Sequence, residues 1–485
     1  MATKQANKYQ LAIYSAVQSP AVEFLNICVQ ATAGAGKTTT LLEILKLIPR
    51  FKKKIFLSFS NTIVNELKSR IPIDTEARTL HSLGCAMLRR RYKQIKVDND
   101  KWFKIFLGTY KKEELDKKAF KKCYEMADIV NYARMTMTPF TKEDLSQMCD
   151  YYSIEYSDQH LSEVIYEFKK ERKNGIIDFT DMIYLPVKLN LVDVEYDYVL
   201  LDEAQDLNKC QKMLVEKIIK PGGRLIAVGD RNQSIYSFSG SNIDSFDQLQ
   251  ARPNTKTLPL SISYRCAKSI VRKAQEIYPD DIEYHENAIE GEVRDGDISE
   301  IEVGDLVICR KTAPLVAVFF ELLSRGMKAS IIGKDIEQGL VNLAEKVQGR
   351  FIEDVYENMS GEIVKLTEEL IQKGVQKIEN QPQYITLEEK IEVLKVILQY
   401  TQKPDQLAQT IKDIFKEDSR GVRLMTIHRS KGLENERVFI IGRYQGKKLY
   451  PSDRATKDWE KIQEDNLQFV AITRAKESFI TLSVE

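Results

Sequence analysis

The sequence has 485 residues, of which 43% are hydrophobic and 29% are charged, a composition that is ordinary for a globular protein and excludes a disordered chain. Its 72 Lys and Arg against 71 Asp and Glu leave a net charge of +1, so overall charge indicates neither a nucleic-acid nor a membrane partner. The polar N-terminus excludes a secretory signal peptide, and the longest apolar run, Leu315 to Phe320, is far shorter than the ~20 residues that a membrane helix needs. Seven scattered cysteines without a CxxC pair exclude a disulfide framework and a zinc finger, so we expect a soluble, cytoplasmic chain of about three domains with no membrane partner.

Apolar runs in the sequence predict buried parallel strands separated by helices. In the first half, helices are predicted at residues 8–17, 38–48 and 62–70, and strands at 27–30, 55–60, 198–201 and 225–228. In the second half, strands are predicted at 306–309, 329–332, 422–426 and 438–441. Residues 85–175 and 335–418 have mainly helical patterns. We therefore predict an α/β fold of two parallel-sheet units, each interrupted by a mainly helical insertion.

Local charge is less balanced than the total. Residues 89–122 contain thirteen Lys or Arg and five Asp or Glu, whereas residues 276–305 contain twelve Asp or Glu and one Arg. Such runs are most often solvated helix faces. The basic run, which also contains Trp102, Phe103 and Phe106, is in addition typical of a surface that binds a polyanion.

A glycine-containing loop is predicted between the first strand and the next helix, with the sequence Ala31-Thr-Ala-Gly-Ala-Gly-Lys-Thr38. Backbone N–H groups of such a loop, together with the helix N-terminus behind it, form a cradle for phosphate. Lys37 is placed to reach the β- and γ-phosphates and the Thr38 hydroxyl to ligate Mg²⁺. The usual pattern begins with Gly, where this chain has Ala31. The predicted nucleotide-binding residues of the loop are Ala33, Gly34, Ala35, Gly36, Lys37, Thr38 and Thr39.

Paired carboxylates follow a predicted strand in Tyr198-Val-Leu-Leu-Asp-Glu-Ala-Gln-Asp206. They fall at the carboxyl edge of the sheet, where ligands of α/β proteins bind. Asp202 is predicted to hold Mg²⁺ through water, and Glu203 to orient or deprotonate the attacking water. Together with the loop, they indicate phosphoryl transfer from ATP.

With these motifs and others in the same order, the sequence resembles the UvrD/Rep/PcrA-like helicases of superfamily 1. The resemblance runs from about residue 7 to residue 476. The further matching segments are Asn7-Lys-Tyr-Gln10, Phe59-Ser-Asn61, Thr79-Leu-His-Ser82, Asp178-Phe-Thr-Asp181, Gly229-Asp-Arg-Asn-Gln-Ser-Ile-Tyr236, Ser263-Tyr-Arg265, Leu424 to Glu434 and Val470 to Lys476.

The resemblance implies two RecA-like domains, 1A and 2A, that use ATP and Mg²⁺. It implies that Gln10 reads the adenine, that Tyr264 stacks on it, and that Gln233 senses the γ-phosphate. Arg265 and Arg474 would neutralise charge on the transferred phosphoryl group, an effect of about 10³–10⁵ in rate. Gly432 and Glu434 complete the implied nucleotide site.

The resemblance also implies a track for single-stranded DNA, with contacts from Phe59, Asn61, His81, Tyr236, Phe238, Thr426 and His428. Aromatic rings there would stack on bases. Phe238-Ser239 replaces the family's usual Trp-Arg pair, which leaves a smaller ring and removes a cation. The alternative interpretations are that Phe238 is a core residue and that His81 and His428 are core or capping histidines.

The implied domain boundaries are 1–84 and 178–262 for domain 1A, 85–177 for insertion 1B, 263–334 and 421–485 for domain 2A, and 335–420 for insertion 2B. Insertion 2B is much shorter than is usual in the family. The chain ends soon after Arg474, so we expect neither the family's C-terminal tail nor a fused nuclease.

Three functional classes are compatible with these observations. The favoured one is an ATP-driven helicase or translocase, with 3′→5′ polarity implied by the resemblance, acting on single-stranded DNA and on junctions between single- and double-stranded DNA. The second is a DNA-stimulated ATPase subunit that senses DNA ends and signals to a partner protein, with the acidic run as its docking surface. The third is a non-catalytic binding module, which the intact Lys37, Asp202, Glu203 and Arg474 argue against.

Overall fold

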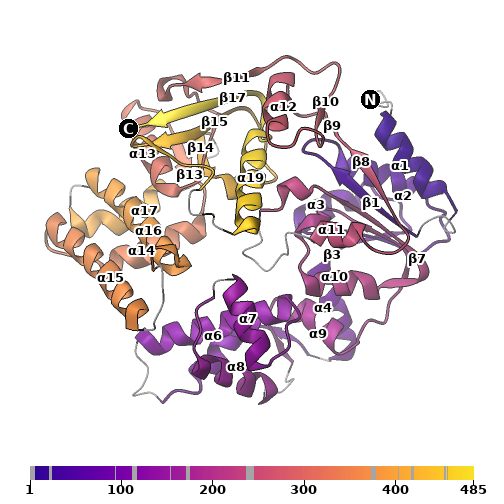
Figure 1. The fold of residues 1–485 in the computed structure, drawn as a ribbon, viewed down its shortest axis with the longest axis horizontal. Helices are drawn as coiled ribbons and strands as arrows, with labels where there is room; N and C mark the ends of the chain where they lie inside the picture. Colours follow the sequence, from indigo (N-terminus) through magenta and orange to yellow (C-terminus); the bar gives the residue numbers. More distant parts are fainter. Residues whose placement is uncertain are drawn as a thin grey trace. The chain divides into compact units, whose positions relative to one another are not determined.

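The computed structural model describes residues 6–20, 25–92, 94–111, 117–152, 154–170, 175–235, 245–372, 378–401, 403–416, 420–452, 455 and 457–485. The chain divides into two compact units, Met1–Ser261 (unit 1) and Ile262–Glu485 (unit 2). Each unit contains a parallel sheet with helices packed against it (Figure 1). The predicted α/β fold with two RecA-like parallel-sheet units and mainly helical insertions is confirmed.

The sheet of unit 1 has the strand order β3-β2-β6-β7-β1-β8, and all its neighbouring strands are parallel. Its strands are β1 (Asn26–Ala31), β2 (Lys54–Ser58), β3 (Thr75–Thr79), β6 (Tyr196–Leu201), β7 (Ile219–Gly229) and β8 (Thr255–Leu260). The helices that accompany the sheet are α1 (Lys8–Gln18), α2 (Lys37–Leu47), α3 (Asn61–Lys68), α4 (Leu80–Arg91), α9 (Asp181–Lys188), α10 (Lys209–Lys217) and α11 (Ser245–Gln250).

Both faces of this sheet are buried. Ile27 and Val29 of β1 belong to a core cluster with α1 and α2, whereas Cys28 between them belongs to a cluster with α4, α9 and α10. Because successive side chains of a strand point to opposite faces, a strand covered on both sides reads as a continuous apolar run. This is why the central strands were predictable from their sequences.

The helical insertion of unit 1 has a core of its own. Its elements are β4 (Lys96–Val97), α5 (Lys101–Leu107), α6 (Lys117–Met135), α7 (Lys142–Tyr152), α8 (Asp158–Lys170) and β5 (Ile176–Ile177). The interpretation of Trp102 and Phe106 as surface aromatics is wrong, because both are fully buried in this core against α6 and α8. Their spacing of four residues places them on one face of α5, where they pack inward.

The sheet of unit 2 has the order β11-β17-β15-β12-β14-β13, with these neighbours parallel and β16 antiparallel to β15. Its strands are β11 (Glu292–Gly296), β12 (Leu306–Cys309), β13 (Ala329–Ile331), β14 (Val422–Thr426), β15 (Asn435–Tyr444), β16 (Lys447–Lys448) and β17 (Ala475–Val484). A separate pair is formed by β9 (Ile262–Ser263) and β10 (Glu283–Tyr284). The helices outside the insertion are α12 (Lys268–Gln275), α13 (Thr312–Ser324), α18 (Ile427–Ser430) and α19 (Asp458–Ile472).

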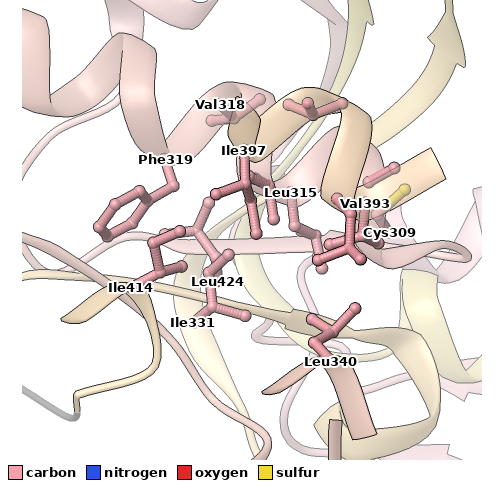
Figure 2. Close-up of a cluster of buried hydrophobic side chains, with 14 of the residues drawn as sticks. Cys309, Leu315, Val318, Phe319, Ile331, Leu340, Val393, Ile397, Ile414 and Leu424 are labelled. Atoms are coloured by element: carbon pink, nitrogen blue, oxygen red, sulfur yellow. The ribbon is translucent and has the colours of Figure 1, made fainter. Parts of the chain in front are cut away.

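The insertion of unit 2 shares one hydrophobic core with the sheet. It consists of α14 (Lys334–Lys346), α15 (Ile352–Gln372), α16 (Pro382–Gln399) and α17 (Leu407–Ile414). Figure 2 shows Val393 and Ile397 of α16 beside Leu315 and Val318 of α13, with Leu424 of β14 below them. In the described part of the chain, no helix is both long enough and apolar enough to cross a membrane.

Candidate functional site

The phosphate loop of unit 1 lies between the buried end of β1 and the first turn of α2. Gly34 and Gly36 have φ values of +70° and +81°, and Gly36 is the N-cap of α2. These left-handed conformations favour glycine, which explains two of the loop's small residues. A Cβ on Gly36 would have no neighbour within 4 Å, so the left-handed φ, and not a lack of space, favours glycine at this position. The loop residues Ala33 and Ala35 are buried, and Thr39 is exposed.

Three of the predicted catalytic residues and the predicted Mg²⁺ ligand Thr38 are in contact at the carboxyl edge of this sheet. The Lys37 ammonium lies 3.7 Å from Glu203 Oε2, and the Thr38 hydroxyl donates a hydrogen bond of 3.3 Å to Asp202 Oδ2. The Glu203 backbone N–H donates to Asp202 Oδ1 over 2.9 Å. The strand β6 thus brings its two carboxylates to the loop, as the sequence predicts.

The electrostatics of Asp202 fit a magnesium ligand. Burial, followed by the neighbouring Glu203 charge, raises the pKa of Asp202 to about 7. A divalent cation here would stabilise the ionised carboxylate, with Thr38, phosphate oxygens and water as its other oxygen ligands. Among the residues that the structure describes, no cluster of three or more His, Cys, Asp or Glu forms an alternative metal site.

Glu203 has an unusual backbone conformation. Its φ is +52°, in the left-handed region, and it caps the short 3₁₀ turn Ala204–Asp206. A non-glycine residue in this region costs of order 1–3 kcal/mol and is found mainly where the surrounding structure holds it for a function. The turn redirects the chain immediately after the strand, so that both carboxylates remain at its end.

Gln233 and Gln10 both have their side chains engaged within unit 1. Gln233 Nε2 donates to Asp230 Oδ2 over 2.6 Å, and burial raises the pKa of Asp230 to about 6. Gln10 forms a reciprocal capping box with Asn7, and its Nε2 donates to Thr40 Oγ1 of α2 over 3.1 Å. The structure therefore places Gln10 beside the helix that follows the phosphate loop.

Three predicted track residues lie just after strands of the same sheet. The exposed Phe59 and Asn61 follow β2, where Asn61 begins α3, and His81 lies in the first turn of α4 after β3. The His81 ring stacks on Phe179, with centroids 3.9 Å apart, and burial lowers the pKa of His81 to about 4. Phe179, which is 52% exposed, was not singled out from the sequence. Tyr236 and Phe238 lie outside the described residues.

In unit 2, the predicted nucleotide-site residues converge on one segment. Arg265 Nε lies 2.6 Å from Glu434 Oε2, and Arg474 Nη1 donates to the Leu433 carbonyl over 2.9 Å. Gly432 has a left-handed φ of +85° at the start of this segment. Arg474 is buried and its Nε donates to the Val470 carbonyl, whereas Arg265 is partly exposed.

Tyr264, Thr426 and His428 have distinct surroundings in unit 2. The Tyr264 ring lies 4.8 Å from the His285 ring, a partner that the sequence did not indicate. Thr426 ends β14 and is the N-cap of α18. Burial, with a smaller contribution from Arg310, lowers the pKa of His428 to about 3, so this ring is neutral near pH 7.

Comparison with known proteins identifies the family of the chain. Residues 14–254 match the model of the UvrD/REP helicase N-terminal domain. The ATP-dependent DNA helicase PcrA of Bacillus subtilis is 24% identical to the chain, over 95% of the chain and 81% of the relative. This chain belongs to the UvrD/Rep/PcrA-like helicases. Other members of the UvrD/Rep/PcrA-like family that it resembles are the PcrA helicases of Staphylococcus epidermidis (23% identical) and Staphylococcus aureus (24%), each matched over 93% of the chain and 80% of the relative.

Proposed function

We propose that the chain is an ATP-dependent DNA helicase or translocase that moves 3′→5′ along single-stranded DNA and acts at junctions with duplex. The observation that carries this proposal is the contact among Lys37, Thr38, Asp202 and Glu203 at the sheet edge, in a chain whose relatives are named ATP-dependent DNA helicases. The polarity rests on the family resemblance.

In this proposal, ATP binds with its phosphates over the N-terminus of α2. Lys37 compensates charge on the β- and γ-phosphates, while Thr38 and Asp202 would hold a Mg²⁺ ion that supplies further positive charge beside the phosphates. Glu203 takes the proton of the attacking water, and Gln233 reports the presence of the γ-phosphate. Catalysis by these groups is mainly positioning and charge stabilisation.

The two arginines of unit 2 differ in their burial and in the partners of their guanidinium groups. The guanidinium of Arg474 is buried and donates to backbone carbonyls, so we assign it to holding the Gly432–Glu434 segment in place. The partly exposed Arg265 pairs with Glu434, which in turn contacts Lys476. Arg265 is therefore our candidate for the arginine finger, and it would exchange Glu434 for the phosphoryl group.

The proposed DNA track uses rings at the ends of strands. Phe59 and the stacked pair of His81 and Phe179 offer aromatic faces in unit 1, and every nucleobase can stack on such a face. Thr426 and His428 are the corresponding positions in unit 2. We retain Tyr236 and Phe238 as a base platform on the strength of their motif.

An unwinding assay with the purified protein tests the function. We expect ATP-dependent strand separation on a duplex with a 3′ single-stranded tail, and none on the same duplex with a 5′ tail. Unwinding from the 5′ tail alone would contradict the polarity. ATP turnover that single-stranded DNA stimulates, without strand separation or movement, would instead identify an ATPase subunit.

Lys37→Ala supplies the control for this assay. We expect a loss of hydrolysis by orders of magnitude with single-strand binding retained, because the variant leaves γ-phosphate charge uncompensated but touches no track residue. Glu203→Gln should bind ATP and DNA and stall, since the amide cannot accept the water's proton. Normal hydrolysis by either variant would show that the phosphate site is wrongly assigned.

A further inference from the structure

Gln205 follows the paired carboxylates by two residues, and its side chain is buried, with 1% of the residue exposed. We propose that Gln205 is a positioning residue that holds the Glu203 carboxylate for proton abstraction by tying it to the end of β7. This inference rests on the proposed ATPase function and adds a residue that acts through Glu203.

The hydrogen bonds of the Gln205 amide define its orientation. The Asp230 backbone N–H donates to Gln205 Oε1 over 3.0 Å, which identifies that end of the amide as its oxygen. The opposite end, Nε2, donates to Glu203 Oε2 over 2.7 Å and lies 3.4 Å from Asp206 Oδ2. One rigid amide thus joins the proposed base to the backbone at the end of the neighbouring strand.

Glu203 depends on such a contact for its orientation. Both the Lys37 ammonium of the phosphate loop and the Gln205 amide contact Glu203 Oε2. These two contacts together fix the position of this oxygen. The backbone of Glu203 is left-handed and caps the 3₁₀ turn, so the chain leaves the extended path of β6 at this residue. A base misplaced by about 1 Å costs on the order of 10²-fold in rate.

The end of β7 leaves little freedom to the amide. A Cβ on Gly229 would lie 2.6 Å from Gln205 Oε1 and 3.0 Å from the Phe246 ring, so glycine is required there for the amide to fit. Asp230 also accepts from Gln233 Nε2 and from the Asn232 backbone N–H. Hydrogen bonds therefore run without a break from Glu203 through Gln205 and Asp230 to Gln233.

These hydrogen bonds link the proposed base Glu203 to the segment that leads into the proposed DNA track. The chain passes directly from Gln233 to Tyr236 and Phe238, the proposed base platform. A shift of the β7 end on DNA binding would move the Asp230 N–H and, through the Gln205 amide, the Glu203 carboxylate. We therefore expect Gln205 to affect hydrolysis most strongly when DNA is bound.

The first test replaces Gln205 by methionine, which has a similar length but donates no hydrogen bond. We expect Gln205→Met to lower the DNA-stimulated kcat about 10- to 100-fold, while the KM for ATP changes little because phosphate binding is untouched. Gly229→Ala should have the same effect, because the added methyl displaces Oε1. Gln211→Met, at a buried glutamine in the capping box of α10, is the matched control and should leave kcat unchanged.

A double-mutant cycle distinguishes positioning from a structural role. If Gln205 acts through Glu203, Gln205→Met should have almost no effect on single-turnover hydrolysis in a Glu203→Gln background. Equal fold-losses in both backgrounds would overturn the inference, as would a wild-type kcat in Gln205→Met. If Gln205→Met has a lowered melting temperature, the same kinetic comparison is made with Gly229→Ala. If the wild-type chain hydrolyses no ATP with DNA, the proposed function fails instead.

Discussion

At the scale of single residues, the stacked rings of His81 and Phe179 join two motifs that lie about a hundred positions apart in the chain. His81 is neutral near pH 7 because burial lowers its pKa to about 4, so it supports the Phe179 ring without adding charge. The exposed face of Phe179 is then available to a base. Because the Phe179 ring is apolar, we expect the stacking of a base on it not to depend on the salt concentration.

We expect Phe179→Ala to weaken single-strand binding by about 1–3 kcal/mol, the usual value of one stacked base. The slope of log affinity against log salt should stay at its wild-type value, because every cation that neutralises a phosphate is still present. Fluorescence anisotropy titrations at several salt concentrations measure both. Phe51→Ala, at a ring that is 83% exposed and outside the matched motifs, is the control, and an equal weakening in that variant would remove Phe179 from the track.

The sequence predicted residues whose role depends on local spacing and missed those whose role depends on tertiary contact. Lys37 and Thr38 follow from a loop between strand and helix, and Asp202 and Glu203 from a strand end. Nothing in the sequence shows that the Gln205 amide reaches β7 or that Phe179 stacks on His81. Trp102 was misassigned because aromatic residues among lysines have the same composition in a binding surface and in the core of an amphipathic helix.

At the scale of elements, a buried ionic network attaches the insertion of unit 1 to α9. The Arg134 guanidinium of α6 is completely buried and donates to both Asp178 and Asp181, at 2.6–3.0 Å. Lys101 of α5 also donates to Asp181, over 2.8 Å. Because Phe179 lies between the two aspartates, this network also fixes the residue that stacks on His81.

Arg134→Met should destabilise unit 1 by about 3–5 kcal/mol, because it leaves buried carboxylates without their partner. Urea unfolding followed by far-UV circular dichroism measures the change. The double variant Arg134→Met with Asp178→Leu should recover much of the stability, since Asp181 keeps Lys101. Arg90→Gln, which breaks an exposed pair with Asp193, should cost less than about 1 kcal/mol, and a comparable destabilisation there would contradict the role of burial.

The strands that the sequence did not reveal lie mostly at sheet edges. β3 and β8 form the edges of the first sheet, and β11 forms an edge of the second. Their burial is partial, and β8 contains Pro259, which an edge strand tolerates because one side needs no donor. Edge strands lack the continuous apolar run of a doubly covered strand, so β11 was hidden within the acidic run.

Helix α16 provides a test of how the second insertion is held. Ile397→Ala should cost about 2–5 kcal/mol of unfolding free energy, because its side chain is fully buried in the core shared with the sheet. Val364→Ala, at a site in α15 that is 54% exposed, should change stability by less than about 0.5 kcal/mol. Native-state hydrogen exchange should show α16 and β12 opening together. Exchange of α16 well before β12 would contradict a shared core.

At the scale of the whole molecule, a net charge of +1 conceals opposite charges on different segments. Many cations of the basic run 89–122 already have acidic partners: Lys101 pairs with Asp181, Lys104 with Asp98 and Lys121 with Glu125. The run is therefore less positive toward a ligand than its composition suggests. Arg89, Arg91, Lys96 and Lys122 are exposed.

Replacing Arg89, Arg91, Lys96 and Lys122 by Gln tests whether this run binds DNA. If it does, single-strand affinity falls for all sequences alike, and the salt slope decreases by roughly 0.7 for each phosphate that the protein no longer neutralises. Lys101 is left intact because its removal would unpair Asp181. Binding titrations between low and moderate salt measure the slope. A slope equal to that of the wild type would assign the run to a solvated helix face.

The two insertions differ in how freely evolution can exchange them. The first encloses its own core from Trp102 to Val164, so the sequence of that core can diverge while the parent sheet keeps its packing, provided that Arg134 and Lys101 keep their ion pairs with Asp178 and Asp181. The second contributes Leu340, Ile397 and Ile414 to the core of its host. Excising it would expose Leu315 and Phe319 to water, so a variant without the insertion would need compensating changes in α13. Grafting experiments and chimeric genes should therefore exchange residues 262–485 together, with the insertion and its sheet kept in one piece.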